Sequence, residues 1–525
     1  MGAGKKNQPF FWLFTQLVVP SHDFFQNMMY KPTFNQRKVF RFHRFARKGY
    51  ALFACLGHVV TIGVLSVATL TTASAAIDHK GIVVDGSATG SATTDDSPDK
   101  EATLEDVEVT GSRAPLALGQ AVRLVTVLSR EDIQAAPVQS INDLLKYAAG
   151  VDVRQRGPIG AQTDISIRGG TSEQITILLN GINICDPQTG HNAFDFPCDL
   201  SDIERIEVLE GPAGRVYGTS SLMGAINIVT RDARSKMAEV RVEGGSFGYL
   251  SAGGRVSLKP QLSPLNSQFS ASYTRSDGYS RSKAGSLNTD FGGSKVFYQG
   301  QYDDEAFRLH WHLGIADKGW GSSTFYASPK WQADDQYEHT TKLYSAIQAE
   351  TKQGLFHLSG NIYWNQNRDR YEGYRGQPEK MKYNYNRTDV YGVSVNNYFD
   401  WVAGRTAFGA ELRNEDLVSG NLGEPLSQTH HIKGTDRDYT LGVNRTNISG
   451  YLEHNLLLSH LTISAGLVAV KNTWSNMNMT VYPGIDISYR PHPAWHFTPL
   501  TIPRSVCRHS RRCITNCRVT APTPT

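Results

Sequence analysis

Four histidines between positions 430 and 460 could in principle bind a metal ion, and a pair of serines could attack a substrate. His430 and His431, followed by His454 and His460, lack a carboxylate or thiol at the spacing of metal ligands, which favours positions facing solvent or a wet interior. Ser220-Ser221 is not set in a nucleophile-elbow pattern and has no evident His and Asp partners. We therefore expect no catalytic residue, no metal site and no cofactor, and we predict that the protein is not an enzyme.

The six cysteines show no zinc-type pairing. Cys55 lies in an apolar N-terminal stretch, Cys185 and Cys198 lie close together, and the other three lie near the C-terminus. If the body of the chain is exported, Cys185 and Cys198 could form a disulfide that closes a short loop. Two free thiols are the alternative.

Composition indicates which elements must position these residues. The length of 525 residues fits two domains plus processing segments, and the apolar residues form no long run beyond the N-terminal region. This excludes a multi-helix membrane protein but not a β-barrel, whose strands alternate. The net charge of +4 arises at the termini, because residues 76–490 hold 39 basic and 48 acidic side chains. A nucleic-acid partner therefore has no support.

The N-terminal region has the order of an export signal. Six basic residues between positions 37 and 48 precede an apolar run that ends in Ala73-Ser74-Ala75. We predict a signal peptide over residues 1–75 with an extended basic segment, or with translation starting at Met28 or Met29; a membrane anchor is the alternative. Residues 76–103 are rich in Gly, Ser, Thr, Ala and Asp, which predicts a flexible periplasmic linker.

A second change of composition follows position 490. Residues 491–525 contain six Pro, five Arg and three Cys but no Gly, Tyr, Asp or Glu. This composition does not continue the preceding strand pattern. We interpret residues 491–525 as an aberrant, frameshifted tail, with a natural disordered tail as the alternative.

An ordered series of motifs lies between these boundaries. Asn180-Gly181 is the signal of a type I′ hairpin turn, and a short helix is expected over 143–148 with Ser140 as its N-cap. Together the motifs closely resemble the plug domain of TonB-dependent receptors over about 130 residues. The motifs are Leu144-Leu145, Gly150-Val151-Asp152-Val153, Ile165-Ser166-Ile167-Arg168-Gly169-Gly170, Ile175-Thr176-Ile177-Leu178-Leu179-Asn180-Gly181, Ile203-Glu204-Arg205-Ile206-Glu207-Val208-Leu209-Glu210-Gly211-Pro212, Val216-Tyr217-Gly218 and Met223-Gly224-Ala225-Ile226-Asn227.

The resemblance implies a coupling segment and a plug. Residues 104–112 would contain the TonB box, which pairs with the periplasmic domain of TonB by strand addition. Residues 113–236 would form the plug domain. The TonB-binding residues would be Asp106, Val107, Glu108, Val109 and Thr110, and the plug signature would be Arg168, Gly169, Asn180, Gly181, Glu207, Gly211, Pro212, Gly218, Gly224 and Asn227.

Charged residues of the plug signature carry a further expectation. By the resemblance, Arg168 and Glu207 would belong to groups that hold the plug inside the barrel, where a partly buried charge needs a partner. An ordinary ion pair within the plug is the alternative. The family often has Arg before Gly-Pro, whereas this chain has Glu210 before Gly211-Pro212, so we assign Glu210 no family role.

Alternating strands dominate residues 237–490. Phe307, Leu309, Trp311, Leu313 and Ile315 alternate with polar or small residues, so one face suits lipid and the other a wet lumen. A soluble sandwich is the alternative from alternation alone. We count about 12 strands, whereas the resemblance implies a transmembrane antiparallel barrel of about 22 strands around the plug. The expected fold is an α+β plug with a partial barrel, and we predict that the chain as given does not form the complete transporter.

The expected function follows from this resemblance. It implies a receptor in the outer membrane of a Gram-negative bacterium, in contact with lipid, that imports a scarce small molecule such as cobalamin or an iron siderophore using TonB and its energising complex. The aromatic-rich stretch over 363–386 is expected to form an extracellular loop with flanking strands. A truncated nonfunctional product and a binding or adhesion protein that transports nothing are the alternatives.

Overall fold

The computed structural model describes residues 108–109, 114–117, 120–155, 161–190, 195–211, 221, 223–233, 236–260, 263–279, 288–323, 335–474, 478–492 and 495–497. Contacts divide the chain after position 98, and every described residue belongs to the second unit. The predicted signal peptide and linker therefore lie outside the described residues. No helix among the described residues is long and apolar enough to cross a bilayer.

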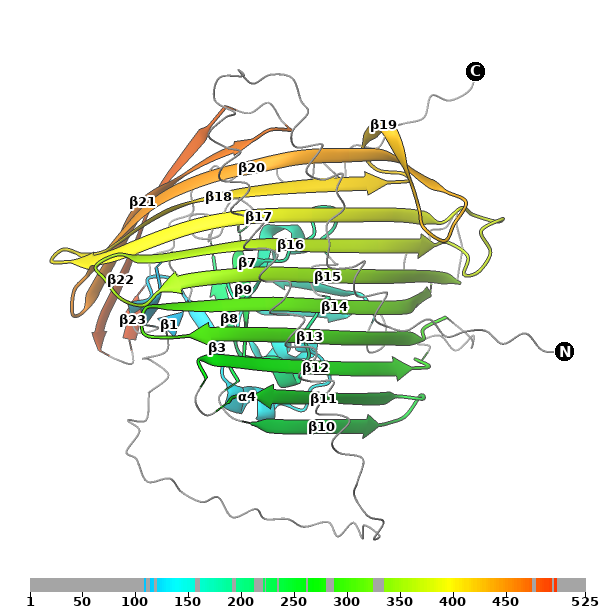
Figure 1. The fold of residues 1–525 in the computed structure, drawn as a ribbon, viewed down its shortest axis with the longest axis horizontal. Helices are drawn as coiled ribbons and strands as arrows, with labels where there is room; N and C mark the ends of the chain where they lie inside the picture. Colours follow the sequence, from blue (N-terminus) through cyan, green and yellow to red (C-terminus); the bar gives the residue numbers. More distant parts are fainter. Residues whose placement is uncertain are drawn as a thin grey trace, which may run out of the picture. The chain divides into compact units, whose positions relative to one another are not determined.

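Fourteen strands between positions 237 and 497 form one antiparallel sheet, the large sheet (Figure 1). Twelve long strands follow one another in chain order, and β19 (Glu424–His431) pairs only with β20. Within the described residues, β10 and the short β23 (Trp495–Phe497) are the unpaired ends of the series. The long strands are β10 (Met237–Gly244), β11 (Leu250–Leu258), β12 (Leu265–Ser276), β13 (Phe291–Asp303), β14 (Phe307–Ser323), β15 (Gln336–Thr351), β16 (His357–Glu372), β17 (Asn384–Trp401), β18 (Gly404–Ser419), β20 (Asp438–Leu457), β21 (Leu461–Asn472) and β22 (Thr480–His492).

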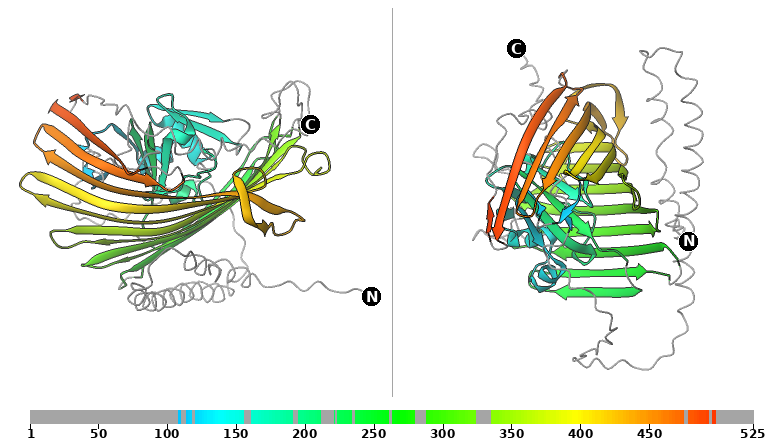
Figure 2. Two further views of the ribbon diagram at one scale, coloured as in Figure 1. Left: turned by 90° about the horizontal axis from the view of Figure 1, so that it is seen from above. Right: turned by 90° about the vertical axis from the view of Figure 1, so that its left-hand side faces the viewer.

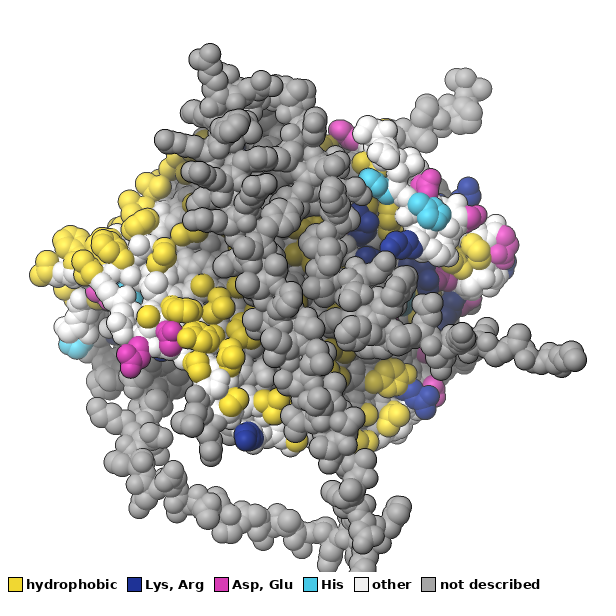
Figure 3. All heavy atoms as spheres, in the orientation of Figure 1, with side chains coloured by type: hydrophobic (Ala, Val, Ile, Leu, Met, Phe, Trp, Pro, Cys, Tyr) yellow, Lys and Arg dark blue, Asp and Glu magenta, His cyan; other side chains and the backbone are white. Residues whose placement is uncertain are grey.

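The two faces of the large sheet differ as the alternation predicts. Directly paired residues of an antiparallel sheet share a face. One row of directly paired residues, which crosses six neighbouring strands, is apolar. The next row along the strands lies on the opposite face and begins with the buried His312. Hydrophobic side chains are visible over much of the uncovered part of this outer face (Figure 3). The apolar row consists of Trp311, Ile347, Ile362, Val393, Leu412 and Ile448.

The two edges of the large sheet carry different connections. Two to five residues join β13 to β14, β15 to β16, β17 to β18 and β20 to β21, and we call this edge the short-turn edge. At the opposite, long-loop edge, 11 to 14 residues join β12 to β13, β14 to β15 and β16 to β17. Outer-membrane barrels have short periplasmic turns and longer extracellular loops. The aromatic-rich stretch over 363–386 contains a loop with flanking strands, as expected, because β16 ends at Glu372 and β17 begins at Asn384.

Residues 108–233 form a separate small α+β region on the concave side of the large sheet (Figure 2). Its main sheet has the order β3-β8-β9-β6-β7, in which only β6 and β9 are parallel. A hairpin and short helices surround this sheet. The elements are β1 (Glu108–Val109), β2 (Leu116–Ala117), β3 (Val125–Leu128), α4 (Arg130–Ala135), α5 (Ile141–Leu144), η4 (Leu145–Tyr147), β4 (Val151–Gln155), β5 (Thr163–Ile167), η5 (Ser172–Gln174), β6 (Ile175–Leu179), β7 (Ile182–Asn183), η7 (Leu200–Asp202), β8 (Ile203–Glu210) and β9 (Gly224–Thr230).

One apolar core joins the small region to the large sheet. Ile177, Ile206 and Ile226 are fully buried inside the small region, and the same cluster extends to Phe297 and Tyr363 on the large sheet. Burying apolar surface is the main favourable term in folding and association. The small region is therefore packed against the sheet rather than tethered beside it.

Three local expectations meet different outcomes. The hydroxyl of Ser140 caps α5 by accepting from the backbone N–H of Asp143, as predicted, although the helix begins at Ile141. The prediction that strands end at position 490 is wrong, because β22 continues to His492 and β23 pairs with it. The alternation of Trp, His and Phe in β23 is a strand signal that the bulk composition of the tail obscured.

Candidate functional site

The Asn180-Gly181 turn connects β6 to β7 and begins a buried polar network. Both residues have positive φ, 51° and 78°, as the predicted type I′ turn requires. The N–H of Gly181 donates to Oδ1 of Asn227 at 2.9 Å, and Nδ2 of Asn227 donates to Glu207 at 3.2 Å. Arg205 also binds Glu207, at 2.9 Å. The structure thus brings together four signature residues that are up to 47 positions apart in the sequence.

A second positive-φ turn, at Arg168-Gly169, follows β5. Nε of Arg168 donates to Glu210 at 3.1 Å, and the Glu210 side chain also lies against Gly150, where an added Cβ would stand 2.7 Å from its carboxylate. Arg168 therefore forms an ion pair within the small region, which was the alternative expected for this residue. Its partner is Glu210, to which no family role was assigned. The contacts described for Glu207 are likewise with residues of the small region.

The other signature glycines are partly described. Gly211 has φ of 90°, and Gly224 lies so close to the backbone that an added Cβ would stand 2.4 Å from the carbonyl oxygen of Leu209. Pro212 and Gly218 lie outside the described residues. Only glycine fits the close approach at position 224 without a shift of the β8 backbone.

Two carboxylates attach the small region to the large sheet. Asp195 binds Nζ of Lys318 on β14 at 2.5 Å and the hydroxyl of Thr340 on β15 at 3.0 Å. Asp202 accepts from Ser270 at 2.7 Å and from Gln268 at 3.1 Å, both on β12. Burial raises the pKa of Asp202 above its usual range, and the hydrogen bonds it accepts oppose that rise.

Further contacts extend the attachment across the sheet. Arg123, just before β3, binds Asp486 on β22 at 2.5 Å. Nζ of Lys295 donates to the carbonyl oxygen of Cys198 at 3.2 Å, and Arg413 donates to that of Cys185 at 3.0 Å. Strands from β12 to β22 therefore hold the small region, so no single contact accounts for its position.

The two neighbouring cysteines serve this attachment through their backbone. Cys185 and Cys198 are both buried free thiols, so the disulfide considered as one alternative is not formed. Burial raises the pKa of the Cys198 thiol, which keeps it protonated and unreactive.

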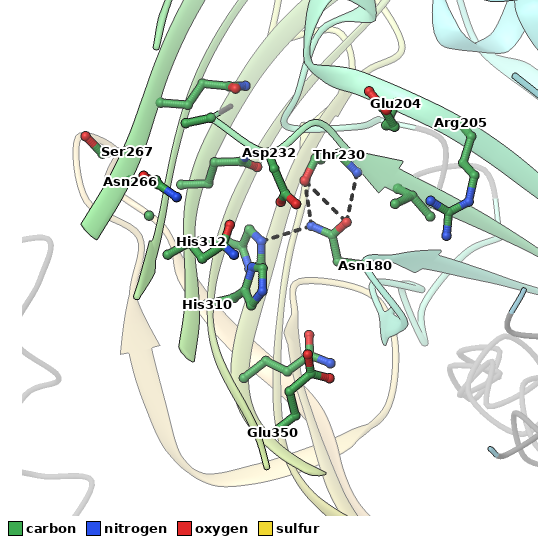
Figure 4. A pocket seen from close by; sticks show the side chains of 17 residues that line it. Asn180, Glu204, Arg205, Thr230, Asp232, Asn266, Ser267, His310, His312 and Glu350 are labelled. Atoms are coloured by element: carbon green, nitrogen blue, oxygen red, sulfur yellow. Dashed lines mark hydrogen bonds between the residues drawn. The ribbon is translucent and has the colours of Figure 1, made fainter. Parts of the chain in front are cut away.

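A cavity of about 220 Å³ lies between the small region and the short-turn edge of β12 to β15 (Figure 4). Asn180, Thr230 and Asp232 line it from the small region, and His310 and His312 line it from β14. Nδ2 of Asn180 lies 2.9 Å from Nε2 of His312, which links the signature turn directly to the large sheet. Two rows of directly paired residues on β12 to β15 form the sheet wall of the cavity. The first row is Gln268, Gln299, His312 and Ala346, of which Ala346 does not line the cavity. The second row is Asn266, Gln301, His310 and Gln348.

The expected TonB box is described only at its centre. Glu108 and Val109 form β1 and pair antiparallel with Ala117 and Leu116 of β2. Asp106, Val107 and Thr110 lie outside the described residues. The central part of this segment is therefore an extended strand whose pairing involves two residues on each side.

Comparison with known proteins identifies the small region. Residues 118–225 match the family described as TonB-dependent Receptor Plug Domain. The small region therefore resembles a TonB-dependent receptor plug domain. The resemblance inferred from the sequence motifs is therefore confirmed, and the name plug domain is used below for residues 108–233.

Curated relatives match part of the chain. The vitamin B12 transporter BtuB of Vibrio vulnificus is 33% identical over 138 residues, which cover 26% of this chain and 22% of that protein. The vitamin B12 transporter BtuB of Photobacterium profundum is 31% identical over 157 residues, or 30% of this chain and 26% of that protein. The matched segment thus spans about a quarter of these relatives' length.

Solved structures share the arrangement of plug and sheet. The siderophore receptor PirA from Acinetobacter baumannii aligns with a TM-score of 0.54 and 17% identity over 70% of this chain and 59% of that chain. The unliganded ferric citrate transporter FecA aligns with a TM-score of 0.56 and 14% identity over 75% of this chain and 64% of that chain. At these identities the likeness shows the fold, which confirms the expected combination of a plug with an antiparallel sheet of the receptor type.

The sequence motifs did not identify the residues through which the small region contacts the large sheet. Asp195, Asp202, Lys318 and the polar lining of the cavity were not singled out. A usable signal exists, because each strand from β12 to β15 has two polar residues two positions apart, and so on one face, near its short-turn end. These pairs are Asn266 and Gln268, Gln299 and Gln301, His310 and His312, and Gln348 and Glu350.

Proposed function

We propose that this chain acts as a TonB-dependent outer-membrane receptor for active uptake of a scarce ligand such as cobalamin or an iron siderophore. The observation that carries the proposal is a plug domain bonded to the concave face of an antiparallel sheet whose outer face is apolar. Such an outer face suits lipid. We further propose export through the predicted signal peptide to the outer membrane of a Gram-negative bacterium.

The coupling step proposed here uses strand addition at residues 106–110. A two-residue pairing such as that of β1 with β2 has few hydrogen bonds to lose, so exchange for a longer pairing with TonB is favourable. Force on this segment would reach β3, which pairs with β8 over four residues at the edge of the plug sheet. Inner-membrane energy would thereby act on the plug domain without an ATP site in this chain.

The ligand class is supported from two directions. The curated relatives reported above are vitamin B12 transporters, and the structures that share the fold include a siderophore receptor and a ferric citrate transporter. The long-loop edge also carries cation and aromatic pairs such as Arg375 over Tyr337, at 4.1 Å from the ring centroid. Lys and Arg side chains are visible toward this edge, near β19 (Figure 3). This edge is the proposed capture surface.

Deletion of residues 106–110 tests the proposal. The full chain and the deletion variant would be produced in a Gram-negative host that lacks its own cobalamin receptor, and surface binding and accumulation of radiolabelled cyanocobalamin would be measured separately, with ferric citrate as a second probe. The proposal requires the full chain to accumulate ligand, which would show that the prediction of an incomplete transporter is wrong. We then expect the deletion to abolish accumulation and to leave surface binding unchanged. A control deletion of equal length, residues 86–90 in the predicted linker, should accumulate ligand normally.

Two results would contradict the proposal. Accumulation that survives the deletion of 106–110 would exclude TonB-driven import. Binding by the intact chain without any accumulation would favour the second candidate, a receptor that binds its ligand but does not transport it.

A further inference from the structure

The outer face of β16 and β17 changes its chemistry in steps toward the long-loop edge. Ile362 and Val393, which belong to the apolar row, are directly paired. Two positions further along the strands, and so on the same face, Trp364 pairs with Tyr391. The next pairs on this face are Gln366 with Asp389, Arg368 with Arg387, and Arg370 with Tyr385. Apolar, aromatic, polar and cationic side chains therefore follow one another over about 25 Å of strand.

The aromatic pair is placed as aromatic side chains are at the interface of a bilayer. Trp and Tyr are enriched there, because the ring packs on acyl chains while its polar atom meets polar groups. Nε1 of Trp364 donates to Oδ1 of Asp389 at 3.0 Å, so the polar end of the indole points toward the long-loop edge. In a membrane, the arginines beyond Asp389 would therefore lie at the level of the lipid headgroups.

Arg368 and Arg387 are directly opposite each other on this face. Like charges in such positions destabilise a sheet. Arg368 is exposed, and among the described residues it binds no carboxylate and makes no hydrogen bond. The carboxylates on the outer face of the flanking strands, Asp317 and Asp416, already accept hydrogen bonds from other side chains of the large sheet. An anion bound between the two guanidinium groups would remove their repulsion.

Two carboxylates bind the other arginines of this cluster but lie beneath them. Asp389 is 3.0 Å from Nε of Arg387, and Glu372 is 2.8 Å from Nε of Arg370. The carboxylate side chains are 7% and 5% exposed, whereas those of the two arginines are 31% and 38% exposed. The surface of the cluster is therefore formed by guanidinium groups, and the charge of Arg368 is not neutralised by an ion pair within the described residues.

A phosphate group has the chemistry that these donors require. A guanidinium group has five N–H donors and binds phosphate oxygens through paired hydrogen bonds. Lys and Arg side chains are visible on the outer face toward the long-loop edge (Figure 3). The apolar row and the aromatic pair on the same face suit the acyl chains of a molecule that carries the phosphate. A lipid with a phosphate in its headgroup matches both parts of this surface, whereas a free anion matches only the cationic part.

We propose that Arg368, Arg387 and Arg370 form a binding site for the phosphate of an anionic lipid headgroup on the long-loop side of the bilayer. This inference rests on the proposed place of the chain in the outer membrane. The acyl chains of the bound lipid lie along the apolar row. Because the site is on the face opposite the plug domain, it fixes the level of the sheet in the bilayer and takes no part in ligand uptake.

Lipid binding by the purified full chain tests the site. The chain would be held in micelles of a neutral detergent, and native mass spectrometry would measure the bound fraction of added phosphatidic acid or phosphatidylcholine. These lipids have the same acyl chains but an anionic and a zwitterionic headgroup. We expect phosphatidic acid to bind about twentyfold more tightly, since each arginine near an anionic lipid phosphate strengthens binding roughly fivefold.

Substitutions of exposed arginines locate the site. We expect Arg368→Gln to weaken binding of phosphatidic acid about fivefold, and Arg368→Lys, which keeps the charge but loses the paired donors, about twofold. Binding of phosphatidylcholine should not change. The matched control is Arg275→Gln, because Arg275 is an exposed residue on the outer face of β12 that pairs with Gly292 and Leu250 and so has no second arginine opposite. This control should bind both lipids as the unsubstituted chain does.

Three results would overturn the site. They are equal binding of the two lipids, equal losses in Arg368→Gln and Arg275→Gln, and displacement of phosphatidic acid by an equal concentration of inorganic phosphate, which would mean that the arginines recognise a free anion. Unfolding followed by tryptophan fluorescence should give the same midpoint for Arg368→Gln as for the unsubstituted chain, so weaker binding reports the site rather than misfolding.

Uptake of cyanocobalamin distinguishes failure of this site from failure of the proposed function. Uptake by a chain that does not discriminate between the two lipids would overturn the site and leave the proposed function intact. Discrimination between the lipids without uptake would support the site and count against active import. A chain that is not recovered from the outer membrane of the host would overturn both.

Discussion

At its Asp195 end, the plug domain is bound to β14 and β15 through a carboxylate, whereas beside the cavity it contacts β14 through the neutral side chains of Asn180 and His312. Lys318 and His312 both face inward on β14, six residues apart, which corresponds to about 20 Å along a strand. Lys318 lies toward the long-loop edge and His312 toward the short-turn edge. One strand pair therefore holds the plug domain in two chemically different ways.

The difference bears on which contact opens first. A partly buried carboxylate and ammonium cannot separate without leaving two unpaired charges, whereas an amide and an imidazole can exchange their bond for water. We therefore expect motion of the plug domain to begin at the short-turn edge, with the Asp195 end as the fixed point.

The charged end should show the largest effect on stability. The Asp195→Ala variant leaves Lys318, whose side chain is 18% exposed, without its carboxylate, and we expect the free energy of unfolding to fall by about 3 kcal/mol. Chemical unfolding in detergent micelles, followed by tryptophan fluorescence, measures this change. The exposed pair of Asp152 and Arg154 is the matched control, and Asp152→Ala should cost less than about 1 kcal/mol. Equal losses in both variants would contradict a special role for the charged end.

The neutral end should show a smaller effect. Asn180→Gly keeps the positive φ of the turn but removes the bonds to Thr230 and His312, and we expect a loss of about 1.5 kcal/mol. Hydrogen exchange of the Thr230 amide, which would lose its acceptor, reports the local opening. A loss larger than that of Asp195→Ala would reverse the proposed order of strengths.

The plug domain could be predicted from sequence because its determinants are local. Positive φ at Asn180 and Gly181 and the N-cap at Ser140 each depend on residues a few positions apart. The strand pattern of the large sheet was predictable for the same reason, since the alternation of apolar and polar side chains is visible within one strand.

The partners across the interface could not be predicted, because they depend on how two separately patterned regions meet. Asp195 and Lys318 are 123 positions apart, and Asn180 and His312 are 132 apart. No short sequence pattern around these residues indicates that either pair will form. The role of Glu210 was missed for a related reason, because Arg168 follows β5 of the small β4-β5 sheet and Glu210 ends β8 of the main plug sheet, 42 positions later.

The smallest expected effect is a dependence of the free energy of unfolding on pH. It arises from Asp202, the second carboxylate that attaches the plug domain to the large sheet. Burial raises the pKa of Asp202 in the folded protein, so between its usual value near 3.8 and the raised value the folded state holds the proton more tightly than the unfolded state. This contribution to stability is present below that window and is lost as the pH rises through it. The groups facing Asp202 are Asp199, Arg255 and Ser270, with Gln268 completing the hydrogen bonds.

Unfolding measured across this window compares the intact chain with Asp202→Asn, which cannot ionise. We expect the intact chain to lose stability relative to the variant as the pH rises, because only its carboxylate must bear a buried charge. Asp143→Asn is a suitable control, since Asp143 is a hydrogen-bonded carboxylate of the plug domain that does not contact the large sheet in the described contacts. A stability difference that stays constant with pH would mean that the Ser270 and Gln268 bonds fully compensate the burial, and that Asp202 belongs with the charged anchor at Asp195.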